Sequence, residues 1–351
     1  MELLEIDGAL GEGGGAILRL SAGFSLLFNR SIRIKNIRAN RPKPGLRLQH
    51  LMGLKALSEL TSSTLSECHV GTKEITIHPN KLIKSNIKVE VGTAGNIGLL
   101  LQPVQIACMG FNKPEKIEIL VNGGGTFGMY APSLNYLKEV TYSFFKKVGL
   151  NIRIEIKKHG FYPKGGAHVK CIIKPPQKKL KAIYLTELGN IDLIQGEIII
   201  TNQLMGRNIG KRIQNTILQL LKKQFNIDVE IKVIGVDSLS SGLGLSLWAY
   251  SNTGAIISSG TILGEKKITS ENLGKIAANK LINYIKNDIP IDNYLSDQII
   301  PLMAYASFDE PSKIKVLEIT NHTKTNLELT KLFVDKNYKI TREKNHYIIE
   351  F

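Results

Sequence analysis

The side chain best placed for nucleophilic chemistry is His322, in the segment ITNHTKTN (319–326). We expect a helix to begin at about Thr325, directly after it. A helix N-terminus lowers the pKa of a nearby imidazole and favours the neutral ring, which is the form able to attack phosphorus. The chain has no G-x-S-x-G elbow, no G-x-x-x-x-G-K-[ST] loop and no lysine-x-aspartate-glycine signature. A catalytic His322 and an ordinary surface histidine both stay open at this point.

A glycine-rich loop, GALGEGGGA (8–16), follows an expected strand and precedes an expected helix. It formally fits the dinucleotide pattern G-x-G-x-x-A, which also needs an acid about 20 residues later. No Asp or Glu lies between Gly13 and Ser58, so the sequence disfavours nicotinamide binding. Two interpretations remain: a tight turn, or a phosphate-facing loop whose lone acid, Glu12, could hold a divalent metal through its carboxylate.

A second loop, RANRPKPGLRLQH (38–50), is strongly basic. A charge run is usually a solvated face. Here Pro42 and Pro44 stiffen the backbone, and arginine forks on a stiff loop suit bidentate phosphate contacts with less side-chain entropy to lose. The loop therefore predicts phosphate binding by Arg38, Arg41 and Lys43.

These segments sit in a repeated order of elements. Over the first 80 residues the pattern predicts strand, helix, strand, helix, strand, strand, and the order recurs from residue 87. A period of about 85 residues indicates a duplicated unit. In each unit the important loops run from the end of a strand to the start of a helix, so they should share a face rich in helix N-termini, which suits anions. The individual elements expected are strands 3–6, 32–37, 87–91, 116–121, 151–156 and 168–173 and helices ending near 28 and 109 or spanning 46–60 and 132–145.

A third copy is interrupted. Its first strand is expected at 182–185, but its helix 293–305, strand 313–319, helix from 325 and final strands come more than 100 residues later. The intervening stretch has its own strand-helix-strand-strand pattern and reads as a separate domain placed in a surface loop. The predicted division is a catalytic domain of residues 1–184 and 277–351 with a small inserted α/β domain at 185–276.

Composition and charge limit the partners. The 351 residues are 43% hydrophobic and 22% charged, which indicates a globular protein, and the net charge of +16 makes a polyanion the first partner to consider. No apolar run is long enough to span a membrane, and the first residues lack the features of a signal peptide, so we expect a cytoplasmic protein without a membrane partner. The three cysteines are far apart and have no C-x-x-C spacing, which favours neither a zinc site nor a disulfide framework.

Together these segments resemble the RNA 3′-terminal phosphate cyclase family over nearly the whole chain. No single segment is decisive, but seven occur in the family's order. They are DGALGEGGGAILR (7–19), RANRPKPGLRLQH (38–50), GTAGNIGLLLQ (92–102), the GGT at 124–126 with Ala131-Pro132, HGFYPKGG (159–166), DNYLSDQ (292–298) and the HTKTN segment from His322.

The resemblance implies an α/β (α+β) fold of three β-α-β-α-β-β units around a pseudo-threefold axis with a small inserted α/β domain. It also implies an ATP-dependent ligase of RNA processing that turns an RNA 3′-terminal phosphate into a 2′,3′-cyclic phosphodiester. In that scheme His322 takes AMP from ATP, the AMP moves to the RNA phosphate, and the 2′-OH closes the ring. The implied partner is RNA with a 3′-terminal phosphate.

The resemblance also assigns residues. Tyr294 would stack on adenine, Glu12 would bind Mg²⁺ or Mn²⁺, and Arg19, Arg41 and Gln49 would hold phosphates of ATP or of the RNA end, beside Arg38 and Lys43 of the basic loop. The remaining residues implied to contact ATP are Gln102, Pro132, Leu295, Ser296, Asp297 and Gln298.

One departure and two alternatives accompany the resemblance. After Pro132 the family often has Pro and an acid before an aromatic residue, whereas this chain has Ser133-Leu134-Asn135-Tyr136. The family includes a ribosome-biogenesis branch that lacks the nucleophile, so a non-catalytic RNA-binding or ribosome-assembly factor is the alternative, and the presence of His322 favours the enzyme. A small-molecule transferase rests on fold analogy alone. The oligomeric state stays open, with a homodimer as one option.

Overall fold

Three of the four sheets have the same strand order. In the computed structural model, which describes residues 3–351, the first two strands of each of these sheets run parallel and the other neighbours antiparallel. The predicted α/β fold class is confirmed, and the pseudo-threefold axis stays a prediction. The sheets are β1(Leu4–Asp7)-β2(Ile32–Lys35)-β4(Ile75–His78)-β3(Thr64–Leu65), β5(Asn86–Asn96)-β6(Ile117–Gly125)-β8(His168–Lys174)-β7(Asn151–Lys158) and β9(Tyr184–Leu185)-β15(Lys313–Val316)-β17(His346–Glu350)-β16(Lys339–Glu343).

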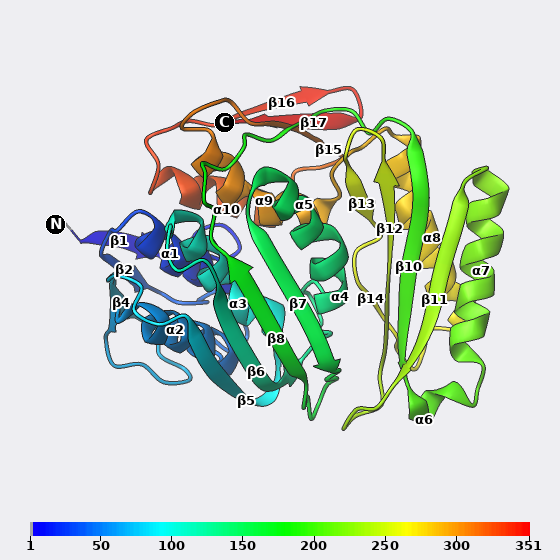
Figure 1. Ribbon diagram of the computed structural model, residues 1–351, viewed down its shortest axis with the longest axis horizontal. Helices are drawn as coiled ribbons and strands as arrows, with labels where there is room; N and C mark the ends of the chain where they lie inside the picture. Colours follow the sequence, from blue (N-terminus) through cyan, green and yellow to red (C-terminus); the bar gives the residue numbers. More distant parts are fainter. Residues whose placement is uncertain (1–2) are drawn as a thin grey trace.

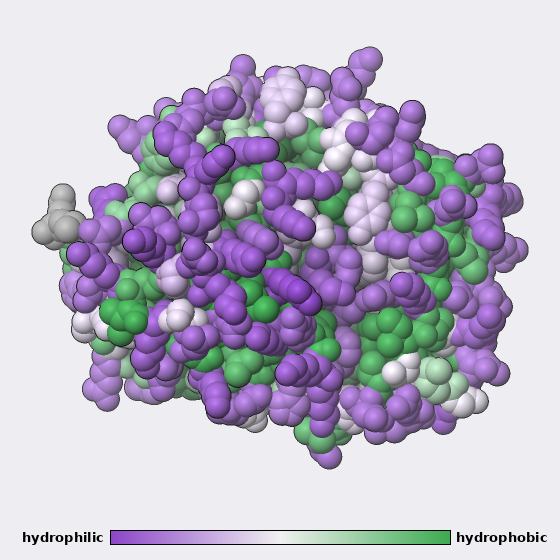
Figure 2. Space-filling model, viewed as in Figure 1, coloured by the Kyte–Doolittle hydropathy of each residue, from purple (hydrophilic) through white to green (hydrophobic). Residues whose placement is uncertain are grey.

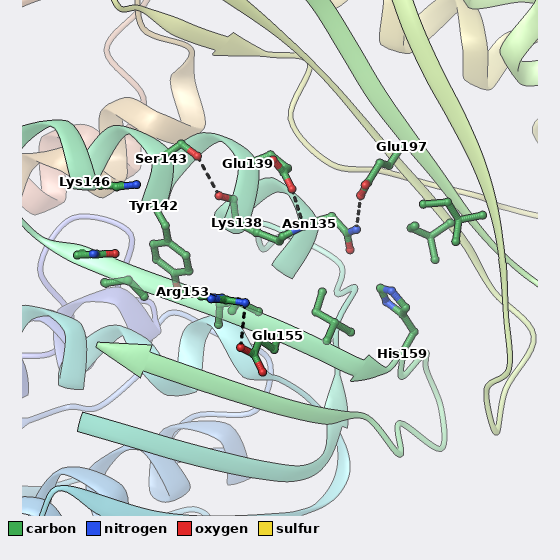
Figure 3. Close-up of a pocket in the computed structure, with 16 residues that line it drawn as sticks. Asn135, Lys138, Glu139, Tyr142, Ser143, Lys146, Arg153, Glu155, His159 and Glu197 are labelled. Carbon is green, nitrogen blue, oxygen red and sulfur yellow. Dashed lines mark hydrogen bonds and ion pairs between the residues drawn. The ribbon is translucent and has the colours of Figure 1, made fainter. Parts of the chain in front are cut away.

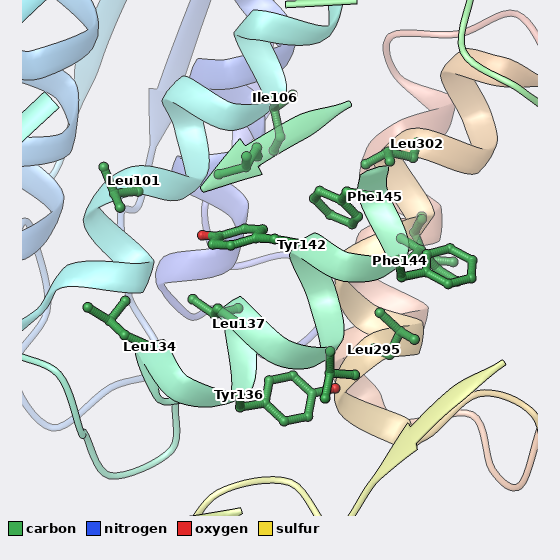
Figure 4. Packing of buried hydrophobic residues seen from close by; sticks show 14 of the residues in the cluster. Leu101, Ile106, Leu134, Tyr136, Leu137, Tyr142, Phe144, Phe145, Leu295 and Leu302 are labelled. Atoms are coloured by element: carbon green, nitrogen blue, oxygen red, sulfur yellow. The ribbon is translucent and has the colours of Figure 1, made fainter. Parts of the chain in front are cut away.

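The helices of these units pack against one another (Figure 1). Between α3, α5 and α9 lies a dry cluster that includes Leu101, Tyr142, Phe145 and Leu295 (Figure 4). Burial of such side chains is the main favourable term in folding. The helices are α1 (Gly15–Leu27), α2 (Leu48–Thr61), α3 (Ile97–Ala107), the 3-10 turn η1 (Cys108–Gly110), α4 (Leu134–Tyr136), α5 (Tyr142–Val148), α9 (Asn293–Ala306) and α10 (Asn321–Lys331).

The helix expected at 132–145 is interrupted. A π-helical turn, η2 (Leu137–Thr141), separates α4 from α5. Such turns are rare and often occur near functional sites. Here it follows Asn135 and Tyr136, which both have partners in other elements described below.

The insertion forms the fourth sheet, in the order β11-β10-β12-β13 with β14 paired to β12. Helix α7 buries Ile213, Ile217 and Leu221, four residues apart and hence on one face, and it packs along α8 at one side of the molecule (Figure 1). The elements are β10 (Ile191–Thr201), α6 (Asn202–Met205), α7 (Ile209–Gln224), β11 (Asp228–Val236), β12 (Leu243–Ser251), β13 (Ile256–Ser258), β14 (Ile262–Leu263) and α8 (Ser270–Lys286).

The predicted boundary between residues 276 and 277 falls inside α8, so it is wrong in detail. Thr269 caps this helix by accepting the N–H of Asn272, and the helix then continues to Lys286 while it packs on α7 and β12. A continuous packed helix belongs to one folding unit. We therefore propose that the insertion extends to the end of α8.

Polar side chains cover most of the face shown in Figure 2, as the charge of the chain leads one to expect. Among residues 3–351, no helix combines the length and the apolar character that crossing a membrane requires.

Candidate active site

His322 lies in the first turn of α10 rather than before it. The expected start at Thr325 is wrong, because Thr320 ends the preceding extended segment and caps the helix. The Thr320 hydroxyl oxygen accepts the backbone N–H of Thr323 at 2.9 Å. An N-cap threonine satisfies one of the free N–H groups of the first turn. His322 thus starts from a rigid helix end that carries positive partial charge.

The glycine-rich loop brings Glu12 to this histidine. Glu12 Oε2 lies 3.2 Å from Nδ1 of His322 and 3.2 Å from Nη2 of Arg41. The close approach needs glycine at position 11, which has φ +53° and whose Cβ would meet the Thr325 hydroxyl at 2.2 Å. The carboxylate therefore joins the nucleophile candidate to the basic loop.

The surroundings of His322 favour a neutral ring. Burial lowers its pKa, and Arg19 and Arg41 lower it further against the opposing effect of Glu12. A neutral ring that donates Nδ1–H to Glu12 keeps its lone pair on Nε2. The side chain remains 44% exposed, so Nε2 is open to a ligand.

Arg19 is a buried cation with neutral partners. It is 9% exposed, its Nε donates to Oε1 of Gln102 at 2.7 Å, and its Nη1 lies 3.3 Å from Nε2 of His50. Burial lowers its pKa to about 9, with further lowering by Arg38 and Arg41. A buried charge is costly unless it is compensated, so this arrangement favours an anionic ligand.

His50 is a residue of this site that sequence reasoning missed. It lies at the start of α2, where its Nδ1 accepts the backbone N–H of Arg47 at 3.3 Å, and it is 4% exposed. Burial lowers its pKa well below the usual value, and Arg19 adds to the effect. Its place at the end of the basic segment was the available signal. A neutral His50 orients Arg19 without adding charge.

Asp297 ties the two helices of the site together. Its Oδ1 accepts the hydroxyls of Thr320 at 2.9 Å and Thr323 at 2.6 Å, so it holds α9 against the capped end of α10. Burial raises the pKa of Asp297 to about 7, and the nearby charge of Glu12 also raises it. The carboxyl group is therefore poised to titrate near neutral pH.

The change Asp297→Asn is expected to stabilise the protein increasingly as pH rises. With a pKa near 7 folded and 3.8 unfolded, the native state binds more protons between these values, so stability falls as pH rises through this range. At about 1.4 kcal/mol per pKa unit, the gain from asparagine should grow by roughly 2 to 3 kcal/mol between pH 5 and pH 8. Urea unfolding at both pH values measures it, with exposed Asp192→Asn as control. An equal effect of Asp297→Asn at both pH values would contradict this prediction.

Tyr294 lies in the first turn of α9, on the side of the insertion. Its ring packs edge-on against Tyr136, with centroids 5.9 Å apart, and lies so close to Gly260 that a Cβ there would meet it at 2.1 Å. Lys280 Nζ lies 5.8 Å from the ring centroid. The backbone carbonyl of Pro132 accepts from Asn96 Nδ2 at 3.5 Å. The predicted stacking role of Tyr294 stays a prediction.

Two of the predicted ATP contacts are buried in the protein. Leu295 is 0% exposed and belongs to the cluster of Figure 4, and Ser296 is also 0% exposed with its hydroxyl donating to the Asn293 carbonyl at 2.8 Å. A helix turns by 3.6 residues, so these two face the core while Asp297 follows on another side. The structure therefore contradicts a side-chain contact of Leu295 or Ser296 with ATP. Gln298 lines a small cavity together with Gln102.

The basic loop is only partly directed at His322. Arg38, with φ +55°, donates through Nη1 to the carbonyls of Lys43 at 2.6 Å and Gly45 at 3.1 Å, so it braces the loop. Lys43 is exposed, and Gln49 Oε1 accepts the N–H of Asn96 at 2.9 Å. Arg41 alone of the loop's predicted phosphate ligands contacts Glu12.

A metal ion would have few protein ligands here. In the part of the chain from residue 3 onward, no group of three or more His, Cys, Asp or Glu side chains is arranged to hold one. Mg²⁺ commonly uses one or two carboxylates together with substrate phosphates. The single carboxylate of Glu12, 23% exposed, fits that kind of site.

Comparison with known proteins agrees with this geometry. A family model described as RNA 3′-terminal phosphate cyclase matches residues 10–340. Proteins named RNA 3′-terminal phosphate cyclase are similar to this chain in three archaea. They are those of Pyrococcus abyssi (35% identical over 341 residues, 97% of this chain and 96% of the relative), Pyrococcus furiosus (36% over 338 residues, 96% and 95%) and Methanothermobacter thermautotrophicus (33% over 345 residues, 97% and 97%).

Proposed function

Because the chain belongs to the RNA 3′-terminal phosphate cyclase family, we propose that it is an ATP-dependent enzyme that cyclises an RNA 3′-terminal phosphate. The observation that carries the proposal is the contact of His322 with Glu12, beside Arg41. A histidine, an acid and an arginine that lie far apart in the sequence have no evident structural reason to meet at a helix N-terminus. They suit transfer of a phosphorus group.

The first step is attack by His322 on ATP. The lone pair of Nε2 forms a bond to the α-phosphorus, the bond from that phosphorus to the pyrophosphate oxygen breaks, and pyrophosphate leaves. Positive charge that develops on the ring is stabilised by Glu12, 3.2 Å from Nδ1. The resulting histidine–AMP bond stores the activation needed for the next step.

The second and third steps transfer AMP and close the ring. An oxygen of the RNA 3′-phosphate attacks the phosphorus of the bound AMP, and the bond to Nε2 breaks. The neighbouring 2′-OH then attacks the RNA phosphorus, loses its proton, and expels AMP. The hydroxyl is already held near its target, and such intramolecular attack reaches effective molarities of roughly 10⁵ to 10⁸ M in favourable cases.

The cations of the site hold the phosphates during these steps. Arg19 supplies a buried guanidinium that Gln102 and His50 orient, and Arg41 supplies a second from the basic loop. Such donors stabilise charge that develops on phosphate oxygens. Glu12 would hold Mg²⁺ or Mn²⁺, which when bound neutralises charge on the triphosphate.

The test is an RNA oligonucleotide with a 3′-phosphate, incubated with the protein, ATP and Mg²⁺. The expected product has an end that resists phosphatase. A matched RNA whose last nucleotide is 2′-deoxy should accept AMP but not cyclise, because it lacks the attacking hydroxyl. RNA binding with steep salt dependence but no ATP consumption would instead favour a non-catalytic RNA-binding or ribosome-assembly factor.

A further inference from the structure

A second cleft lies between β7 and α4 on one side and the inserted strands β10 and β11 on the other (Figure 3). Its volume is about 600 Å³, within the usual range for small-molecule sites. None of the residues assigned to the proposed reaction lines it. Helix α4 separates the two regions: its Tyr136 donates to Asp292 at the start of α9, whereas its Asn135 lines the cleft.

The inner part of this cleft collects hydrogen-bond acceptors. Asn135 is 6% exposed, its Nδ2 donates to Oε2 of Glu197 at 2.7 Å, and its Oδ1 has no partner. A buried acceptor without a partner costs about 1 to 3 kcal/mol, so it needs an explanation. Figure 3 shows the Asn135 amide and the His159 ring facing the same space.

His159 completes this acceptor group. Its Nδ1 lies 3.0 Å from the Thr126 hydroxyl, and burial lowers its pKa to about 4, which leaves the ring neutral at pH 7. The apolar side chains of Ile199 and Ile234 line the same cleft. A planar ligand with N–H donors on its edge would satisfy Asn135 and Glu197 and pack against these isoleucines.

The outer part of the cleft carries cations. Lys146 is exposed, Lys138 pairs with Glu139 at 2.7 Å, and Arg153 pairs with Glu155 at 3.3 Å. Exposed pairs of this kind contribute little to stability and open readily to another anion. An anionic group on the ligand would therefore lie toward these side chains.

We propose that this cleft binds a nucleotide through both features. A base that presents adjacent N–H donors, as guanine does, contacts Asn135 Oδ1 and Glu197, and its phosphate lies toward Lys146 and Arg153. The ligand is either a free nucleotide or one residue of a bound RNA. The RNA source rests on the proposed function, whereas the free nucleotide does not.

The experiment uses the full chain and GMP as the probe, with binding measured by calorimetry. We expect Asn135→Leu to weaken GMP binding at least about tenfold and Arg153→Ala to weaken it severalfold. Arg153 is 72% exposed, so its replacement leaves the fold intact. Lys157→Ala, an exposed lysine on the same strand, is the matched control and should bind GMP as the wild type does.

The second measurement identifies the source of the nucleotide. If the ligand is part of RNA, the same variants raise the KM for guanosine-containing RNA while self-adenylylation by ATP keeps its wild-type rate. If it is a free nucleotide, GMP binding falls and the KM for RNA is unchanged. GMP binding that is undetectable in the wild type, or unaffected by both variants, overturns the proposal. Absence of self-adenylylation in the wild type would count against the proposed function alone.

Discussion

Replacing His322 with alanine is expected to abolish self-labelling by α-labelled ATP, with a loss of at least about 10³-fold. The wild-type label should be acid-labile and stable to alkali, as a phosphorus–nitrogen bond is. The loss follows because Nε2 of His322 is the attacking atom and no other side chain is positioned to replace a covalent nucleophile. Denaturing gel electrophoresis after incubation with Mg²⁺ and labelled ATP measures it.

The matched control is His78→Ala. His78 is an exposed histidine of β4 whose Nδ1 lies 3.0 Å from the Ser31 hydroxyl, away from the Glu12 contact. It should label like the wild type. Label that persists in His322→Ala would mean that another residue accepts AMP and would remove the assignment.

Replacing Arg19 with methionine is expected to reduce kcat/KM for both ATP and the RNA 3′-phosphate by at least about 10²-fold without lowering the melting temperature. Methionine keeps the apolar stem but removes a buried charge. In the absence of an anion that charge lies among Arg38 and Arg41 with neutral partners, so its removal relieves repulsion. Buried unbalanced charges of this kind are typical of functional sites.

Two measurements separate this role from a structural one. Pyrophosphate should raise the melting temperature of the wild type and much less that of Arg19→Met, because a ligand stabilises only the state that binds it. Arg33→Met is the control: this arginine of β2 is 40% exposed and pairs with Glu74, so its loss should leave activity near wild type. A strongly destabilised Arg19→Met that still responds to pyrophosphate would contradict the prediction.

The order of elements in each unit was predictable from periodicity, because alternating and 3.6-residue patterns report directly on burial. Element ends were less predictable. The start of α10 was missed because the decisive interaction is one hydroxyl, that of Thr320, accepting one N–H. The boundary at 276 was wrong because α8 continues through a polar stretch, and only its packing on α7 shows which unit owns it.

The candidate site shows the same division. Charge pattern and spacing pointed to Glu12, Arg41 and His322, which the fold brings together. They could not show that Arg38 bonds to its own loop, or that Leu295 faces the core, because both depend on side-chain direction. Asn135 was noted only for a missing acid, and its unpartnered oxygen became visible through the surrounding cleft.

The distribution of the site along the chain has a consequence for synthesis on the ribosome. Glu12 and Arg19 emerge early, but the third sheet pairs β9 with β15 across the whole insertion, and His322 follows β15. Contacts between such distant segments form late in folding. Nascent chains can therefore display the anion-binding half of the centre well before the nucleophile exists, and chemical competence arrives only with the final helix and hairpin.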